Sequence, residues 1–202
     1  MNKTAKIKGN TDAEIRHAFH ARHLHRTKAR PDTLVIDELG LAHAKCRIDV
    51  AVINGCIHGY EIKSARDTLG RLDGQLKIYC QTLQKLTLVV ATKHVDTVMG
   101  KLPKWCGLIE AREGPRGGIS FHKIQNAAYN PDVNPFMVVH LLWRDEVKDL
   151  LKKKGFENRD LHGNRKRLYE MLCKNMNLNE ITTSILGCME QRKAWRDLPA
   201  RE

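Results

Sequence analysis

The sequence predicts an α/β fold, in which a mixed central sheet is flanked by helices and followed by an all-helical C-terminal extension. Between residues 11 and 125, stretches of helical periodicity alternate with short strand-like stretches. After a proline- and asparagine-rich loop over 126–136, only helical patterns remain. The chain therefore divides into a core domain over 1–125 and a helical extension over 126–202.

The first predicted helix begins after Thr11 and has a basic outer surface. Thr11 as N-cap and Glu14 three residues later form a capping box. Ile15 and Phe19 belong to one apolar face, and Pro31 ends the helix. The remaining positions are mainly basic: Arg16, His17, His20, Arg22, His23, His25, Arg26, Lys28 and Arg30.

A strand and a β-hairpin are predicted next. Residues 33–41 are β-branched at their start and carry Glu38. Residues 46–53 alternate between apolar and polar positions, as expected for a strand with two different faces. The dipeptide Asn54–Gly55 is a strong hairpin signal, so 56–64 is the return strand.

The rest of the core and the extension follow from their periodicity. A helical stripe is formed by Leu72, Leu76, Tyr79 and Leu83. After it we expect, in order, an interior strand, a helix closed by Pro103 and a second hairpin around the sequence EGPRGG. The extension is predicted to contain a helical turn around 147–151 and helices over 164–176 and 178–195.

The charge of the chain indicates a polyanionic partner. Lysine and arginine number 35 against 23 acidic residues, which gives a net charge of +12. Nucleic acid, expected to be DNA, is the leading candidate partner. The residues expected to contact it are Arg22, Arg26 and Arg30 on the first helix, together with Arg47. The sequence also leaves a homodimer open.

The sequence carries no sign of export or membrane insertion. The stretch MNKTAKIKGN is polar and basic, without the apolar segment of a secretory signal, and no apolar run approaches the roughly 20 residues of a membrane helix. The six cysteines are scattered and form no C-x-x-C pair, so we expect them to be small core residues. A cytoplasmic location is expected.

Three charged residues interrupt the apolar pattern of the first hairpin. One strand face carries Ile48, Val50 and Val52, and Asp49 lies on the other. Glu61 and Lys63 share one face of the return strand. Burying such charges without partners costs several kcal/mol. Because Mg²⁺ takes one or two carboxylates plus waters, Asp49 and Glu61 predict a site for Mg²⁺ or Mn²⁺, with Lys63 beside it to stabilise charge on a phosphate.

The stretch from Glu38 to about Thr92 resembles the PD-(D/E)xK nuclease superfamily. The pattern E…RxDVA…GYEIKS..DTL.RL..Q...Y is similar to an uncharacterised bacterial branch of it that carries a helical C-terminal tail. The proline of the motif is absent, because Ile48 precedes Asp49. The resemblance implies a restriction-endonuclease-like core and a metal-dependent deoxyribonuclease that hydrolyses phosphodiester bonds.

The resemblance also implies roles for individual residues. Glu38, Asp49 and Glu61, with the backbone carbonyl of Ile62, would bind the metal ion. The catalytic set would be Glu38, Asp49, Glu61, Lys63 and Gln75. Tyr79 shares the helix face of Gln75 and would lie near the nucleic acid, although its place in the leucine stripe favours a core residue.

Two other interpretations remain open. His17, His20, His23 and His25 are close enough in sequence to suggest a zinc site, but no cysteine completes the set. The last two helices could form a helix-turn-helix, which would make the chain a non-catalytic nucleic-acid-binding protein. A structural helical cap explains the same pattern. The sequence does not distinguish DNA from RNA, or endonuclease from exonuclease.

Overall fold

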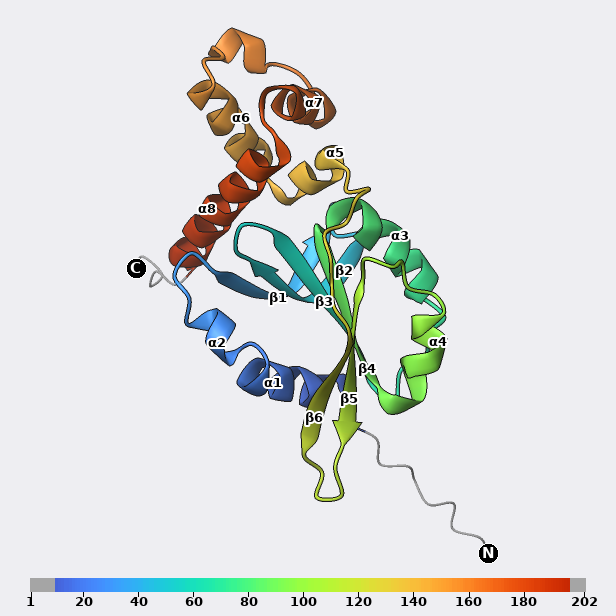
Figure 1. Ribbon diagram of the computed structural model, residues 1–202. Helices are drawn as coiled ribbons and strands as arrows, with labels where there is room; N and C mark the ends of the chain where they lie inside the picture. The colour runs from blue at the N-terminus through green and yellow to red at the C-terminus, as the bar shows by residue number, and fades with distance from the viewer. Residues whose placement is uncertain (1–9, 197–202) are drawn as a thin grey trace, which may run out of the picture.

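The computed structural model describes residues 10–196, so the N-terminal stretch MNKTAKIKGN, in which no secretory signal is expected, lies almost wholly outside the described residues. A six-stranded mixed sheet forms the centre (Figure 1). Its strands, in spatial order, are β1 (Leu34–Leu41), β2 (Cys46–Ile53), β3 (Ile57–Lys63), β4 (Lys85–Ala91), β5 (Gly107–Glu113) and β6 (Ile119–Gln125). Strands β3, β4 and β5 are parallel, and the other neighbours pair antiparallel. The predicted α/β architecture is confirmed.

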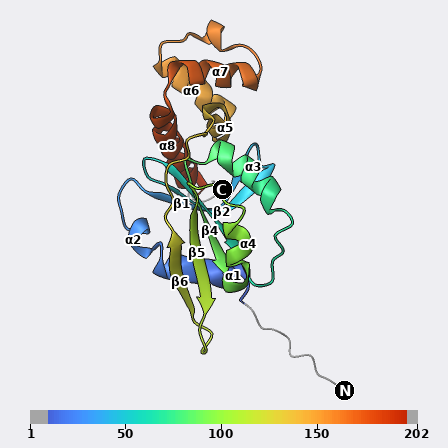
Figure 2. The ribbon, with the colours of Figure 1, turned by 45° about the vertical axis from the view of Figure 1, so that its right-hand side comes forward.

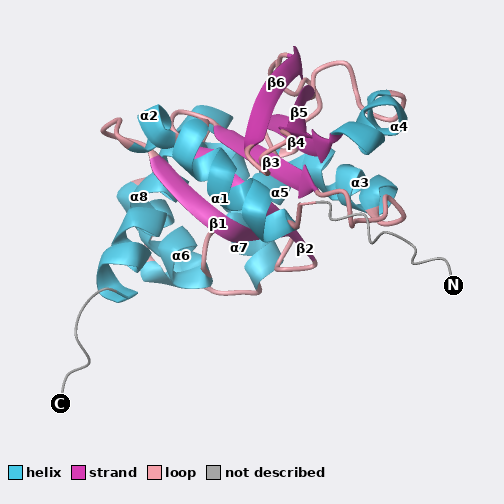
Figure 3. Cartoon of the chain, turned by 90° about the horizontal axis from the view of Figure 1, so that it is seen from below, coloured by secondary structure: helices cyan, strands magenta, loops and turns pink. Residues whose placement is uncertain are grey.

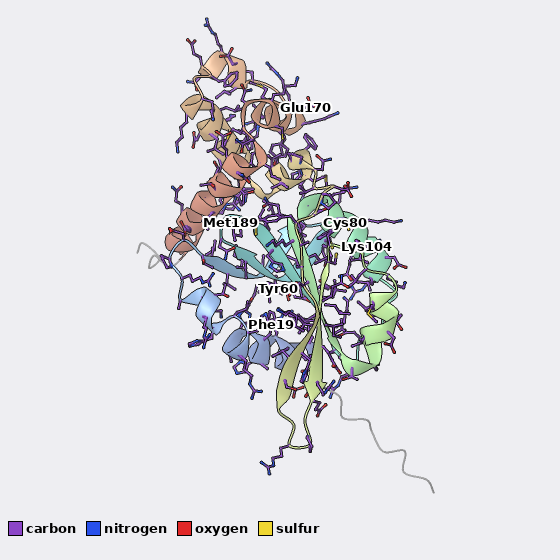
Figure 4. The ribbon with its side chains drawn as sticks, viewed as in Figure 1. Phe19, Tyr60, Cys80, Lys104, Glu170 and Met189 are labelled. Carbon is purple, nitrogen blue, oxygen red and sulfur yellow. The ribbon has the colours of Figure 1, made fainter. Side chains whose placement is uncertain are left out.

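Helix α1 (Asp12–Arg22) covers one face of the sheet, and the short helix α2 (His25–Lys28), which has no buried residue, follows it (Figure 3). Phe19 is completely buried there, and its ring lies 5.1 Å from that of Tyr60 (Figure 4). The predicted capping box at Thr11 is present. The apolar stripe of α1 therefore docks the helix on the strands that carry the charged residues of the hairpin.

Helices α3 (Leu72–Thr82) and α4 (Val95–Met99) lie on the opposite side from α2 (Figure 2). The predicted leucine and tyrosine stripe of α3 is buried against the sheet. Short 3₁₀ turns occur at Thr92–His94, Val139–Leu141 and Asn158–Leu161. All six cysteines are free. No described helix combines the length and the hydropathy that crossing a bilayer requires.

The helical extension stacks on one end of the sheet (Figure 1). It consists of α5 (Pro135–Val138), α6 (Arg144–Lys153), α7 (Arg165–Asn175) and α8 (Leu178–Arg196). Its apolar side chains belong to the same hydrophobic cluster as β1 and α3. Inside this cluster Thr182 donates a hydrogen bond of 3.0 Å to the side chain of Gln84, which also accepts the N–H of Ile57. The extension is thus tied to the core by a buried polar contact.

The single helix predicted between Thr11 and Pro31 is divided in two. Helix α1 ends at Arg22, and the N–H groups of His23 and Leu24 both bond to the carbonyl of Phe19. Leu24 is almost completely buried, and the His23 ring stacks on Phe19 at 4.6 Å. The chain bends because this turn buries Leu24, which a straight helix with the same apolar face would not do.

Close approach of α3 to the sheet requires a glycine in the strand, not in the helix. A Cβ atom at Gly59 would lie 2.5 Å from Leu83 Cδ1, whereas one at Gly74 would meet nothing within 4 Å. We expect Gly59→Ala to lower the free energy of unfolding by about 1–3 kcal/mol through overpacking. Gly74→Ala should raise it by up to about 1 kcal/mol, because alanine is the better helix former. Urea unfolding checks both, and equal stability of the two variants would contradict the packing.

Candidate active site

A cleft of about 490 Å³ opens where the start of β2 and the end of β3 are no longer paired. It lies between α1 and α3. All the residues expected to be catalytic or to bind metal line it: Glu38, Asp49, Glu61, Ile62, Lys63 and Gln75. The fold therefore gathers residues from β1, β2, β3 and α3 in one place.

Glu38 and Asp49 lie where the regular alternation of side chains between the two faces of the sheet is interrupted. Val50 packs under α1, but Ile48, two residues earlier, packs on the α3 side. The expectation that both share one face is therefore wrong. Glu38, which lies across from Asp49 in the β1–β2 ladder, has a φ of +57°. This left-handed residue twists the ladder locally, and both carboxylates come to lie beside α1.

At the end of the β2–β3 hairpin, the side chain of Asp49 accepts a backbone hydrogen bond in place of a carbonyl of the neighbouring strand. The last paired residues of β2 and β3 are Val50 and Tyr60. Beyond them, Asp49 Oδ2 accepts the N–H of Ile62 at 2.6 Å. Burial, and next the negative charge of Glu61, raise the pKa of Asp49 to about 7, although the Ile62 N–H and Arg16 oppose the shift.

Glu61 is held by three side chains that all come from β3 and α3. Its Oε1 accepts the Lys63 ammonium at 2.5 Å and the Gln75 amide at 2.8 Å. Its Oε2 accepts the Tyr79 hydroxyl at 2.6 Å. Lys63 also donates to Gln75 Oε1 at 3.1 Å. The buried charges are thus paired and hydrogen-bonded, which removes most of the cost of placing them in the sheet.

Tyr79 differs from the expectation that it lies near the nucleic acid. Its ring is completely buried, and its hydroxyl also bonds to the carbonyl of Arg47 at 2.8 Å. Burial, together with the charge of Glu61, raises its pKa, so the hydroxyl stays a donor. Tyr79 therefore contacts the Glu61 carboxylate, and its completely buried ring offers no surface to a strand of nucleic acid.

Arg16 belongs to the cleft, although the sequence placed it on the basic outer surface. Its guanidinium pairs with Glu38, with Asp12 at 2.8 Å and with Asp49 at 3.4 Å. A sequence signal for it existed, because Arg16 borders the buried Ile15 and lies four residues after Asp12. These features indicate that Arg16 belongs to the cleft only once the packing of α1 over Asp49 is known.

The other arginines expected to bind nucleic acid have different surroundings. Arg47 is exposed at the rim of the cleft, 3.4 Å from Glu38. Arg26 and Arg30 are exposed on and just after α2. Arg22 donates to the carbonyl of Ile119 in β6 at 2.5 Å, so this guanidinium already has a partner within the protein.

The histidines of α1 and α2 do not converge on a zinc site. His20 lies 2.8 Å from Asp37, and His23 stacks on Phe19. Over residues 10–196, no group of three or more His, Cys, Asp or Glu side chains has an arrangement that could hold a metal ion. This includes Glu38, Asp49 and Glu61 in the cleft, which form no such group in the structure. Their carboxylates and the Ile62 carbonyl are nevertheless hard oxygen donors of the kind that Mg²⁺ uses together with waters.

We expect the stability of the metal-free protein to fall as the pH rises from about 4 to about 7. The unfolded chain releases the Asp49 proton near 3.8, whereas the folded protein keeps it to about 7. Between these values the folded state binds the extra proton, so raising the pH removes that contribution. Urea unfolding in EDTA at pH 5 and pH 8 measures the effect. Asp49→Asn should flatten this dependence, and an equal slope in the two proteins would contradict the raised pKa.

The fold and the cleft define a mixed α/β protein with a buried carboxylate–lysine cluster at the end of its β2–β3 hairpin. Residues 11–198 match the family described as Bacteriophage P4 protein cII, and the chain belongs to this family. Protein cII of Enterobacteria phage P4 is 32% identical over 163 residues, which are 80% of this chain and 60% of that protein. The chain thus spans about 60% of the length of this relative. A protein of unknown function from Silicibacter pomeroyi, SPO1766, has a TM-score of 0.43 and 18% identity, over 74% of this chain and 93% of that one.

Proposed function

We propose that the chain is a metal-dependent nuclease of the PD-(D/E)xK type that hydrolyses phosphodiester bonds in DNA. The observation that carries the proposal is the network around Glu61. Lys63, Gln75 and Tyr79 all bond to this carboxylate, and Asp49 lines the same cleft. A purely structural ion pair would not need a second carboxylate, Asp49, that lines the same cleft and whose pKa is raised to about 7.

Asp49 and Glu61, with the Ile62 carbonyl and Glu38, would hold Mg²⁺ or Mn²⁺. When bound, the ion supplies positive charge to the phosphate oxygens and lowers the pKa of water. The Ile62 N–H fixes the Asp49 carboxylate, and Tyr79 fixes that of Glu61. Hydrogen bonds within the chain therefore hold these two carboxylates in the cleft before an ion binds.

In this proposal, Lys63 stabilises the negative charge that develops on the phosphate. Its ammonium lies in the cleft, where it is oriented by Glu61 and by Gln75. Hydrolysis adds a water oxygen to phosphorus and releases a sugar hydroxyl, and negative charge grows on the oxygens around phosphorus. A fixed ammonium in a largely buried site stabilises that charge more than one in water would.

The alternative of a non-catalytic binder with a helix-turn-helix tail has less support. Helices α7 and α8 do follow each other closely. However, α8 uses Ile181, Ile185 and Met189 to pack on the core. The exposed side chains described on α8 are uncharged or acidic: Asn179, Thr183, Glu190 and Gln191. Such a surface is not suited to phosphate contacts.

A cleavage assay with and without Mg²⁺ tests the proposed function. The substrates are linear, nicked, branched and single-stranded DNA, with a matched RNA strand in place of each single-stranded DNA. We expect Mg²⁺-dependent hydrolysis of at least one DNA substrate and none in EDTA. Absence of cleavage on all substrates, in Mg²⁺ and in Mn²⁺, would contradict the proposal.

Affinity for DNA should depend on salt through the exposed arginines of the α2 region. Each phosphate contact contributes about 0.9 to the slope of log K against log salt. We expect the double variant of Arg26 and Arg30 to alanine to reduce this slope by up to about two in Ca²⁺. Arg22→Ala should change it less, because Arg22 bonds to Ile119. An unchanged slope in the double variant would exclude this surface from the binding face.

A further inference from the structure

A second cleft, of about 360 Å³, lies between the β1–β2 turn and the helical extension. Ala44 of the turn lines both this cleft and the candidate active site. No acidic residue lines the second cleft, whereas two arginines, two histidines and a tryptophan do: Arg165, Arg192, His43, His140 and Trp143. The two clefts are therefore neighbours separated by one turn of the backbone.

Trp143 forms a rigid and exposed aromatic surface in this second cleft. Trp143 is 58% exposed. It is the N-cap of α6, and its backbone N–H donates to Glu146 at 2.6 Å. The Arg192 guanidinium lies 4.2 Å from the indole centre. Arg192 is itself fixed by Glu146 at 2.7 Å and by the carbonyl of Leu141 at 2.9 Å. The indole thus lies against a guanidinium that is itself held by two partners.

Of the two arginines that line the cleft, Arg192 pairs with Glu146, whereas Arg165 has no such partner among the described residues. Arg165 is exposed at the start of α7 and forms no hydrogen bond or ion pair with residues 10–192 in the structure. Lys45 is exposed on the turn. Burial lowers the pKa of His43, and it lowers that of His140 to about 4, with Arg165 and Lys45 adding to both shifts. A free guanidinium in such surroundings attracts an anion.

The turn between the two clefts is unusually constrained. Ala42, His43 and Ala44 have consecutive φ values of 50°, 58° and 63°, a left-handed conformation that is costly for residues with a Cβ. The His43 ring stacks on that of His140 at 4.2 Å and lies 5.9 Å from Tyr169. Packing against the extension therefore fixes the wall that the clefts share.

We propose that the second cleft binds a single-stranded segment of the nucleic acid whose scissile phosphate occupies the active-site cleft. One base stacks on Trp143, and a phosphate lies beside Arg165. A duplex has no free base faces to offer, so the site selects an unpaired segment. This inference rests on the proposed nuclease function and adds to it a preference for substrates with a single-stranded part.

Fluorescence titration with a labelled oligothymidylate of about 12 nucleotides tests the inference, in Ca²⁺ to prevent cleavage. Loss of one stacked base should weaken binding about tenfold in Trp143→Ala. Trp143→Phe keeps an aromatic face and should stay within about threefold of the wild type. Arg165→Ala should reduce the salt slope by about one. Affinity for a blunt duplex of equal length should change less than about twofold in all three.

Tyr129→Ala is the matched aromatic control, because Tyr129 is 63% exposed and also lies near a cation, Lys85, at 4.3 Å. Lys152→Ala is the control for charge on an exposed helix surface. Equal weakening by Trp143→Ala and Tyr129→Ala would overturn the inference. So would an equal loss in Trp143→Phe and Trp143→Ala, or thymidine monophosphate binding as tightly as the oligonucleotide.

Failure of this inference can be told apart from failure of the proposed function. Cleavage that persists while oligothymidylate binding is independent of Trp143 would overturn the second cleft alone. Binding that depends on Trp143 in a protein that cleaves no substrate would overturn the nuclease proposal alone. Thermal unfolding of every variant checks that the fold is retained, which we expect because Trp143 and Arg165 are exposed.

Discussion

Replacing Asp49 by asparagine is expected to reduce Mg²⁺-dependent cleavage by about 10³-fold or more. Asparagine keeps the oxygen that accepts the Ile62 N–H, so the end of the hairpin should stay intact. It removes the negative charge that would hold the ion, and metal assistance contributes several kcal/mol to hydrolysis. Single-turnover rates at saturating protein measure the loss.

Asp96→Asn provides the control for this substitution, because Asp96 is exposed on α4, outside the residues that line the cleft. It should cleave at the wild-type rate. The metal-free Asp49→Asn protein should also be more stable than the wild type at pH 8, since it lacks the repulsion between Asp49 and Glu61. Normal cleavage by Asp49→Asn would remove Asp49 from the site and with it the metal assignment.

Replacing Lys63 by methionine or by arginine is expected to lower the cleavage rate by at least about 10²-fold. Methionine removes the charge, and a loss of this size follows the removal of a prearranged electrostatic donor. Arginine keeps the charge but is larger and planar, so it cannot meet Glu61 and Gln75 as the compact ammonium does. Affinity for DNA in Ca²⁺ should change little, because the role of Lys63 is in the transition state.

Lys101→Met is the matched control, since Lys101 is an exposed lysine that also pairs with a carboxylate, Asp73. It should leave both rate and affinity unchanged. A gel-shift titration beside a single-turnover rate for each variant separates binding from chemistry. If Lys63→Met cut DNA normally, the cleft would be a metal-binding or structural feature only, and the binding-module alternative would have to replace the nuclease.

The elements with strong local signals were predictable from the sequence. The Asn54–Gly55 turn, the Thr11 capping box and the leucine stripe of α3 depend on residues near one another in the chain. The same holds for Glu61 and Lys63, whose two-residue spacing places them on one strand face. Gln75 and Tyr79, one helical turn apart, do bond to each other. The chemistry of these residues could therefore be inferred before the fold was known.

Contacts between distant segments were not predictable in this way. Arg16 reaches Asp49 across 33 positions, and Arg22 reaches Ile119 across 97. The interrupted side-chain alternation at Glu38 and Asp49 depends on the pairing of β1 with β2 and on the point where β2 stops pairing with β3. A periodic pattern describes one element at a time, so it cannot show where a neighbouring element removes or supplies a partner.

The sequence by itself determined the α/β class, the helical extension, and the acidic residues and the lysine of the candidate site. Hydrophobic periodicity and side-chain chemistry are local properties, so they can be recognised without the fold. Only the tertiary structure decided that Arg16 faces the carboxylates and that Tyr79 is a buried support. It also decided that the extension places Trp143 and Arg165 beside the turn at Ala44. These positions are set by the docking of helices on the sheet, where many weak contacts between distant residues fix one arrangement.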